Sequence, residues 1–227
     1  MSAVYEHSPI DLSTPETDTS PLRVLVVDDH PAVRMGLREL FDDQPDFVVV
    51  DAVDSADAAM SLAEREPLDV AVVDYQLGSR NGLWLSRKLK RLPHPPRVVI
   101  YSAYCDGPLA ATSVVAEADG LVSKGGIGAE LCDTVRAVAH GRVRLPTVPP
   151  ALATALRRRL DAEEQAIFGM LLAGIPPAEI STMLGISSAG LESRLWAMLR
   201  KLEALPHESI AARRGGPHNG RRRSSAF

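Results

Sequence analysis

The segment Arg23-Val24-Leu25-Val26-Val27-Asp28-Asp29 decides the fold of the first half of the chain. Its short, β-branched apolar run predicts a strand buried on both faces, as is typical of parallel sheets. Similar runs recur at 47–53, 70–73, 98–101 and 121–122, and each is followed by apolar residues at helical spacing. This alternation predicts an α/β domain with a doubly wound, five-stranded parallel sheet of the flavodoxin-like kind.

The second half of the chain changes to a purely helical pattern. Asp161 with Glu164 three residues later predicts a capped helix start, and Gly174 and Gly185 predict two helix ends. Helix, tight glycine turn and helix form the outline of a helix-turn-helix, so we expect a small all-α domain here. The predicted segments are a disordered leader (1–21), the α/β domain (22–142), a proline-rich linker (143–155), the helix-turn-helix domain (156–205) and a basic disordered tail (206–227).

The composition indicates a cytoplasmic protein that does not enter the membrane. No apolar run reaches the roughly 18 residues that cross a bilayer, and no secretory signal starts the chain. Cys105 and Cys132 have no metal-binding or redox spacing, so we expect both to be small buried residues in a reducing compartment. The net charge of −4 means that contact with nucleic acid has to be local.

Charged and hydroxyl side chains follow four of the predicted strands. Asp28 and Asp29 end the first strand, Asp74 the third and Ser102 the fourth, and Lys124 follows the fifth. Because the carboxyl ends of parallel strands meet at one edge, we expect these side chains to converge. Clustered carboxylates repel one another, and Mg²⁺ relieves that repulsion. The pattern therefore predicts a Mg²⁺ site.

Such a site suits phosphoryl chemistry. A carboxylate beside Mg²⁺ can attack phosphorus and become an aspartyl phosphate. The cation and a lysine would then neutralise the phosphoryl oxygens, and a serine hydroxyl can donate to the new phosphate.

Residues 22–142 resemble the receiver domains of two-component response regulators of the NarL/FixJ family. The segments that carry the resemblance are Val26-Val27-Asp28-Asp29-His30-Pro31, Val72-Val73-Asp74, Asn81-Gly82, Ser102-Ala103 and Ser123-Lys124. The resemblance implies Asp74 as the phosphoacceptor and a sensor histidine kinase as the phosphodonor. It implies Asp29, Asp74 and the Gln76 carbonyl as Mg²⁺ ligands, with Asp28 acting partly through water. Ser102 and Lys124 would contact the phosphate.

The chain departs from that family at three places. Leu77-Gly78 follows the acceptor strand where the family usually has Met-Pro, and Glu117-Ala118 stands where it usually has Gly-Ala. The aromatic switch position, three residues before Lys124, holds Leu121. Tyr101 and Tyr104 lie nearby in the sequence and offer aromatic rings. We interpret them as packed or surface tyrosines and not as substitutes for the aromatic switch residue. The departure at Leu121 concerns the coupling of phosphorylation to output.

A second set of segments lies in the helical half: Leu160-Asp161-Ala162-Glu163-Glu164, Ala173-Gly174, Glu179-Ile180, Leu184-Gly185-Ile186-Ser187 and Leu199-Arg200-Lys201-Leu202. With these segments, residues 160–205 resemble the LuxR-type DNA-binding domain. The resemblance implies promoter DNA as a partner and a homodimer as the expected assembly. The core pattern matches, but Gly190-Leu191-Glu192 replaces the usual Thr-Val-Lys, and the dimer-forming fourth helix is shortened to about 209–214. Arg194, Arg200 and Lys201 are cations that would contact the DNA backbone. The arginine run 157–159 would add to these contacts, or it is equally well interpreted as a solvated helix start. The expected outward stripe of the third helix is Ser188, Ala189, Glu192, Ser193, Trp196 and Arg200.

Four functional interpretations follow. The first is a transcription regulator tuned by phosphorylation of Asp74. The second is a signalling adaptor whose helical module binds a protein, favoured by the acid Glu192 and by Trp196 on the outward stripe. The third, motivated by Leu121, is a phosphorylation-independent DNA binder. A free-standing phosphotransfer enzyme fits least, because the helical module would have no role. We therefore expect a regulator and not an enzyme.

Overall fold

A computed structural model describes residues 20–203 with the exception of residue 79. The expected leader up to residue 19, the basic tail and the short helix at 209–214 lie outside the described residues. Contacts divide the chain into two compact units: Met1–Tyr104 with Glu117–Leu145, and Cys105–Ala116 with Pro146–Phe227. No helix of the described part is long and apolar enough to cross a membrane.

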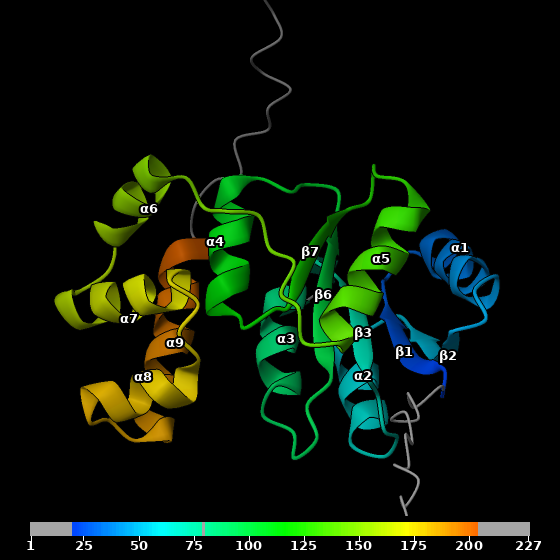
Figure 1. Cartoon of the computed structure of the whole chain (residues 1–227), viewed down its shortest axis with the longest axis horizontal. Coiled ribbons are helices and arrows are strands. Elements are labelled where there is room, and N and C mark those ends of the chain that lie inside the picture. Colours follow the sequence, from blue (N-terminus) through cyan, green and yellow to red (C-terminus); the bar gives the residue numbers. More distant parts are fainter. Residues whose placement is uncertain (1–19, 79, 204–227) are drawn as a thin grey trace, which may run out of the picture. The chain divides into compact units, whose positions relative to one another are not determined.

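The first unit is built on the five-stranded parallel sheet that the sequence predicts (Figure 1). Its strand order is β2-β1-β3-β6-β7, so the chain starts near the middle and winds outward in both directions. The strands are β1 (Leu22–Val27), β2 (Phe47–Val53), β3 (Val70–Asp74), β6 (Arg97–Ser102) and β7 (Gly120–Ser123).

Helices cover both faces of this sheet. Helices α1 (Pro31–Asp42) and α5 (Gly128–Ala139) share one apolar core with alternate residues of the strands, such as Val24 and Val72. Helices α2 (Ala56–Ala63) and α3 (Gly82–Leu89) pack together on the other face. Burial on both faces explains why the central strands are uninterrupted apolar runs.

A short hairpin that the sequence did not predict follows β3. Strands β4 (Gln76–Leu77) and β5 (Arg80–Asn81) pair antiparallel and lead into α3. The Asn81 side chain caps α3 by accepting a hydrogen bond from the Trp84 N–H at 2.8 Å. A Cβ atom at Gly82 would lie 2.3 Å from the Asp74 carbonyl oxygen, so only glycine allows this close approach to the end of β3.

Part of the predicted linker extends the edge of the sheet. Arg144 forms a parallel bridge with Gly120 of β7. Its N–H donates to the Asp119 carbonyl at 2.7 Å, and its own carbonyl accepts from the Leu121 N–H at 3.1 Å. The buried Leu121 side chain thus belongs to a strand whose outer edge is held by the chain that leaves the first unit.

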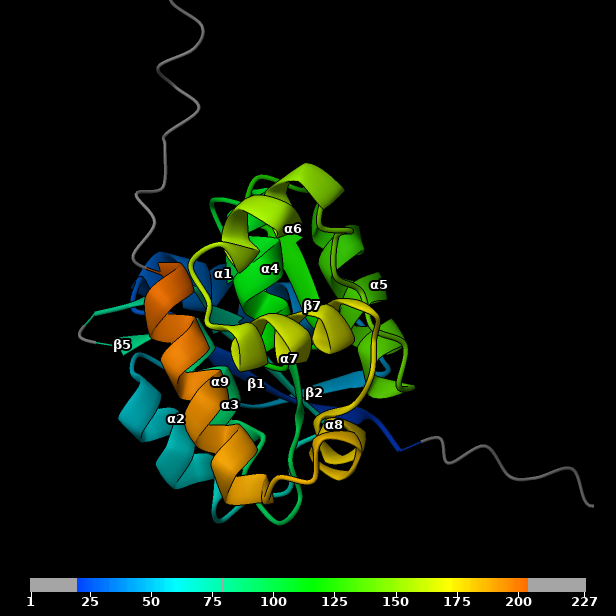
Figure 2. The same ribbon diagram turned by 90° about the vertical axis from the view of Figure 1, so that its left-hand side faces the viewer.

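The second unit is helical, and it contains the predicted helix-turn-helix (Figure 2). Helices α7 (Ala162–Leu172), α8 (Pro177–Leu184) and α9 (Ser188–Glu203) pack on one another, with the expected capping box at Asp161 and a left-handed Gly185 after α8. Helix α4 (Gly107–Val115) lies between β6 and β7 in the chain but groups by contacts with this unit, where it packs against α6, α7 and α9.

Three sequence interpretations need correction. Helix α6 (Pro150–Arg157) was not predicted and occupies part of the expected linker. The arginines at 157–159 therefore lie at the end of a helix and not at the start of one. Cys132 is buried as expected, but Cys105 is exposed, because it lies in the loop between β6 and α4.

Glu117 occupies a backbone conformation that normally favours glycine. Its φ of 60° lies in the left-handed region, at the position where the resembling family has glycine. The Glu117 carboxylate is 2.8 Å from Arg91 Nη2 and 3.7 Å from Nη1 of Arg87, whose side chain is fully buried. A buried guanidinium needs a compensating charge, which accounts for an acid at this strained position.

We expect Glu117→Gln to lower the free energy of unfolding by about 1–3 kcal/mol, because it removes a carboxylate that compensates the charge of the fully buried Arg87. Urea unfolding of the whole chain measures this loss. The exposed Glu39, changed to Gln, is the matched control and should cost little. Equal losses in the two variants would show that the Glu117 carboxylate is not needed to stabilise Arg87.

Candidate functional site

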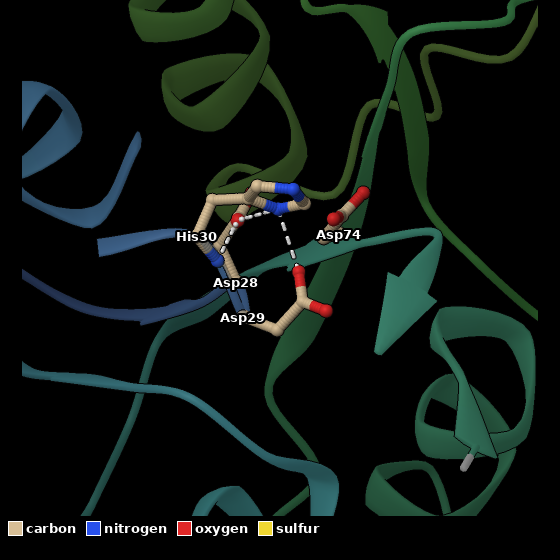
Figure 3. Close-up of side chains that lie close together, drawn as sticks. All are labelled: Asp28, Asp29, His30 and Asp74. Atoms are coloured by element: carbon tan, nitrogen blue, oxygen red, sulfur yellow. Dashed lines mark hydrogen bonds and ion pairs between the residues drawn. The ribbon is translucent and has the colours of Figure 1, made fainter. Parts of the chain in front are cut away.

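Four strand ends bring the predicted site residues to one edge of the sheet. Asp28 and Asp29 follow β1, Asp74 ends β3, Ser102 ends β6 and Lys124 follows β7. Figure 3 shows Asp28, Asp29, His30 and Asp74 gathered at this edge, where one potential ligand atom from each lies within 4.8 Å of the others. The sequence expectation that distant acids converge here agrees with the structure.

The Lys124 ammonium lies between two buried carboxylates. Its Nζ is 2.6 Å from Asp28 Oδ2 and 2.9 Å from Asp74 Oδ2. The Asp28 and Asp74 side chains are 1% and 5% exposed, so this single cation compensates two charges that water scarcely reaches. An ammonium between two carboxylates leaves a net negative pocket, which attracts further cations.

The loop after β1 holds the acid pair in place. The His30 N–H donates to Asp28 Oδ1 at 2.9 Å, and His30 Nδ1 is 2.6 Å from Asp29 Oδ1. From the first turns of α1, Arg34 Nη1 donates to the Asp28 carbonyl at 2.6 Å. Sequence reasoning assigned no role to His30 or Arg34. The position of His30 directly after the acid pair was the available signal.

The remaining predicted residues surround Asp74. Ser102 is buried, and its hydroxyl accepts a hydrogen bond from the Tyr104 N–H at 3.1 Å. The Lys124 N–H donates to the Ser102 carbonyl at 2.8 Å, which ties β7 to β6 beside the pocket. The Gln76 N–H bonds to the Asp74 carboxylate, while the Gln76 side chain is exposed.

Burial shifts the pKa values of the central acid and base. It raises the pKa of Asp74, and the Asp28 charge adds to the rise, against the opposing hydrogen bond from Lys124. Burial by itself would lower the pKa of Lys124, but hydrogen bonds to Asp28 and Asp74 outweigh it and raise that pKa. Lys124 is therefore a permanent cation at neutral pH, and the environment disfavours the ionised form of Asp74.

The donor set fits a small, hard divalent cation. Three of its four clustered side chains offer carboxylate oxygens, and Asp29 is partly open to solvent. Mg²⁺ prefers a few carboxylates and keeps several water molecules, which an exposed rim permits. Burial is the main cause of the raised pKa of Asp74, and a cation here would also relieve the repulsion from Asp28 that adds to the rise.

The tyrosines near the site occupy different environments. Tyr101 is half-buried, and its ring lies 5.7 Å from Lys124 Nζ. Tyr104 is 52% exposed, whereas Leu121 at the switch position is 7% exposed. The aliphatic side chain at 121 is thus buried.

Helix α9 carries the residues predicted to face DNA. Ser188, Ala189, Ser193 and Arg200 are exposed, whereas Glu192, Arg194, Trp196 and Lys201 are half-buried, so Trp196 is not the fully outward residue that its position suggested.

Two of the α9 cations are held by acids at the start of α7. Arg194 Nη2 is 2.6 Å from Glu163 Oε2, and Lys201 Nζ lies within 2.6 Å of both carboxylate oxygens of the buried Glu164. Sequence reasoning missed these acidic partners, because more than 30 residues separate them from α9.

Comparisons with known proteins agree with this arrangement. The family model "Response regulator receiver domain" matches residues 24–136. The chain is 26% identical to the nitrate/nitrite response regulator protein NarL of Escherichia coli K12, over 82% of this chain and 92% of NarL. It is 32% identical to the DNA-binding transcriptional activator DevR/DosR of Mycobacterium tuberculosis, over 76% of this chain and 77% of that protein.

A solved structure gives the same result. The structure of a LuxR-family two-component response regulator from Aurantimonas sp. SI85-9A1 matches with a TM-score of 0.53 and 30% identity. The match covers 60% of this chain and 94% of that one.

We expect Asp74→Asn to stabilise the protein at pH 7 in the absence of divalent cations. The pKa of Asp74 is higher in the folded than in the unfolded chain, so ionised Asp74 opposes folding above its folded pKa. The gain should vanish below about pH 3, where the carboxyl is protonated in both states. Thermal unfolding at both pH values measures it. The exposed Asp54, changed to Asn, is the control, and a gain no larger than the control's would contradict the expectation.

Proposed function

The chain belongs to the response regulators, and we propose that it accepts a phosphoryl group on Asp74 and regulates transcription by binding promoter DNA through α7–α9. The observation that carries this proposal is the position of Lys124 Nζ, within 2.9 Å of a carboxylate oxygen of both Asp28 and Asp74. A buried acid beside a fixed ammonium combines a nucleophile with a charge that stabilises transferred phosphate.

In this proposal the transfer takes place at the Asp74 carboxylate. One of its oxygens forms the new bond to phosphorus while the P–N bond of a phosphohistidine in the sensor kinase breaks, and the histidine nitrogen keeps the bonding electrons. The Lys124 ammonium neutralises phosphoryl oxygens, and the Ser102 hydroxyl donates to one of them. The buried position of Ser102 limits competition from water for that hydrogen bond.

We propose Mg²⁺ as the cofactor, held by the Asp29 and Asp74 carboxylates and the Gln76 carbonyl, with Asp28 acting partly through water. When bound, it would supply the charge that offsets the phosphoryl oxygens. The cluster geometry supports the acidic part of this set, because one ligand atom each of Asp28, Asp29 and Asp74 lies within 4.8 Å of the others.

The output partner in this proposal is DNA. DevR/DosR is named a DNA-binding transcriptional activator, and its match to this chain extends beyond the receiver domain. The helix-turn-helix in the second unit supports the same role. Homodimer formation stays a prediction, because the segment expected to mediate it lies outside the described residues. A cytoplasmic location stays a prediction as well.

A second candidate function is a signalling adaptor whose helical unit binds a protein. The ion pairs of Arg194 and Lys201 with acids of α7 favour it, because they reduce the positive charge that α9 offers to phosphates. Phosphorylation of Asp74 is common to both functions, so a test of DNA binding separates them.

Incubation with Mg²⁺ and a small phosphodonor should add one phosphate to Asp74. Asp74→Asn should abolish the labelling, and Lys124→Ala should reduce it strongly while leaving Mg²⁺ binding largely intact. Intact-mass measurement counts the phosphate, and chelation of Mg²⁺ should prevent its addition. Undiminished labelling of the Asp74→Asn variant would overturn the assignment of the phosphoacceptor.

Glu192→Lys should tighten DNA binding, most strongly at low salt. The change removes a carboxylate and adds a cation one position after the buried Leu191 of α9. The slope of log K against log salt should steepen by about one unit if a phosphate contact forms. Fluorescence anisotropy with a duplex from upstream of its own gene measures both effects. A lysine at the exposed Ala166 of α7 is the control, and an equal gain there would favour the adaptor.

A further inference from the structure

Among the described cations of the second unit, two groups differ in their partners. Arg194 and Lys201 on α9 are held by carboxylates of α7. Three consecutive arginines, Arg157, Arg158 and Arg159, are all exposed at the end of α6, and within the described residues no acid lies at ion-pair distance from them. Within the described residues of this unit, the turn between α6 and α7 therefore holds the largest group of exposed cations without an acidic partner, beside the exposed Arg200 of α9.

Two buried leucines fix this turn. Leu156 is 2% exposed and Leu160 is 5% exposed, and the three arginines lie between them in the chain. The Arg159 N–H donates to the Leu156 carbonyl at 3.0 Å, and the Leu160 N–H donates to the Arg157 carbonyl at 3.0 Å. The two hydrogen bonds and the two buried leucines hold this turn, and the three side chains between them are exposed.

The neighbouring helix leaves space for one of these guanidinium groups. A Cβ atom at Gly169 of α7 would lie 3.0 Å from Arg157 Nη2 and 3.8 Å from its Cζ. A glycine inside a helix lowers the stability of the folded protein by roughly 0.5–1 kcal/mol relative to alanine, so a glycine at this position calls for a structural reason. The space that Gly169 leaves for the Arg157 side chain beside α7 is such a reason.

The nearest acids along the chain do not neutralise the turn. Glu163 is 2.6 Å from Arg194, whereas Asp161 accepts a hydrogen bond from the Glu164 N–H at 2.9 Å and lies 3.6 Å from Lys201. Helix α9 and the capping box thus occupy the carboxylates that would otherwise pair with the arginines.

We propose that Arg157, Arg158 and Arg159 form a surface that binds the DNA phosphate backbone. The inference rests on the proposed DNA-binding function and assigns the electrostatic part of the DNA affinity to these three residues. Guanidinium groups match phosphate geometry with paired N–H donors. Each phosphate neutralised on duplex DNA contributes about 0.9 to the slope of log K against log salt. This surface supplies affinity without reading the sequence of bases.

The test compares the full-length protein with a variant in which all three arginines are changed to Gln. Fluorescence anisotropy with a random-sequence duplex, between about 50 and 200 mM salt, gives the slope. The slope should fall by about two to three units. A matched control changes the exposed Arg38, Arg65 and Arg142 of the first unit to Gln, which removes the same charge and should leave the slope unchanged. Lysine at 157–159 should retain most of the slope.

The outcomes separate this inference from the proposed function. If the unmodified protein binds no duplex at low salt, the DNA-binding function itself fails. If it binds and the 157–159 variant keeps the full slope, the DNA-binding function stands, but the proposed role of the three arginines is overturned. The arginines would then face a protein partner or only solvent. Equal losses in both triple variants would overturn it as well, because net charge alone would then explain the effect. Unchanged thermal unfolding of the variants confirms that the comparison is made on folded protein.

Discussion

The contact of one ammonium with two buried carboxylates is the interaction on which the rest of the first unit depends. Lys124 Nζ lies within 2.9 Å of oxygens of Asp28 and Asp74, which come from strands far apart in the chain. Removing Lys124 would leave two carboxylates buried without compensation, whereas removing one carboxylate leaves the other paired with Lys124. The strand order makes this contact possible, because β1 and β3 are neighbours and β6 alone separates β3 from β7.

Local contacts then position the residues at this edge of the sheet. Gly82 permits the close approach of α3 to the Asp74 carbonyl, and Arg34 holds the Asp28 carbonyl from α1. At the opposite end of the sheet, the buried Asp119 contacts Lys90, Arg97 and the Val98 N–H, and its backbone carbonyl receives Arg144. Both ends of β7 are therefore fixed, one by the pocket and the other by the chain that leaves the sheet.

The helical unit uses its charges differently. Acids at the start of α7 stabilise the helix terminus and pair with Arg194 and Lys201 of α9. This pairing joins two helices of the helix-turn-helix, but it also reduces the positive charge of the helix expected to face DNA. Arg200 of α9 stays exposed, and the turn between α6 and α7 adds the three exposed arginines Arg157, Arg158 and Arg159.

The sequence by itself determined the features that neighbouring residues encode. Apolar runs predicted the five strands, the order of Asp28, Asp74 and Lys124 at strand ends predicted the pocket, and Asp161 with Glu164 predicted a helix start. Only the tertiary structure decided which distant groups meet: Arg194 with Glu163, Arg144 with β7, and Arg87 with Glu117. Periodicity and caps depend on residues within a few positions, whereas these partners depend on which faces of separate elements come together. Helix α6 and the exposed Cys105 were missed for the same reason, since packing and loop position decide them.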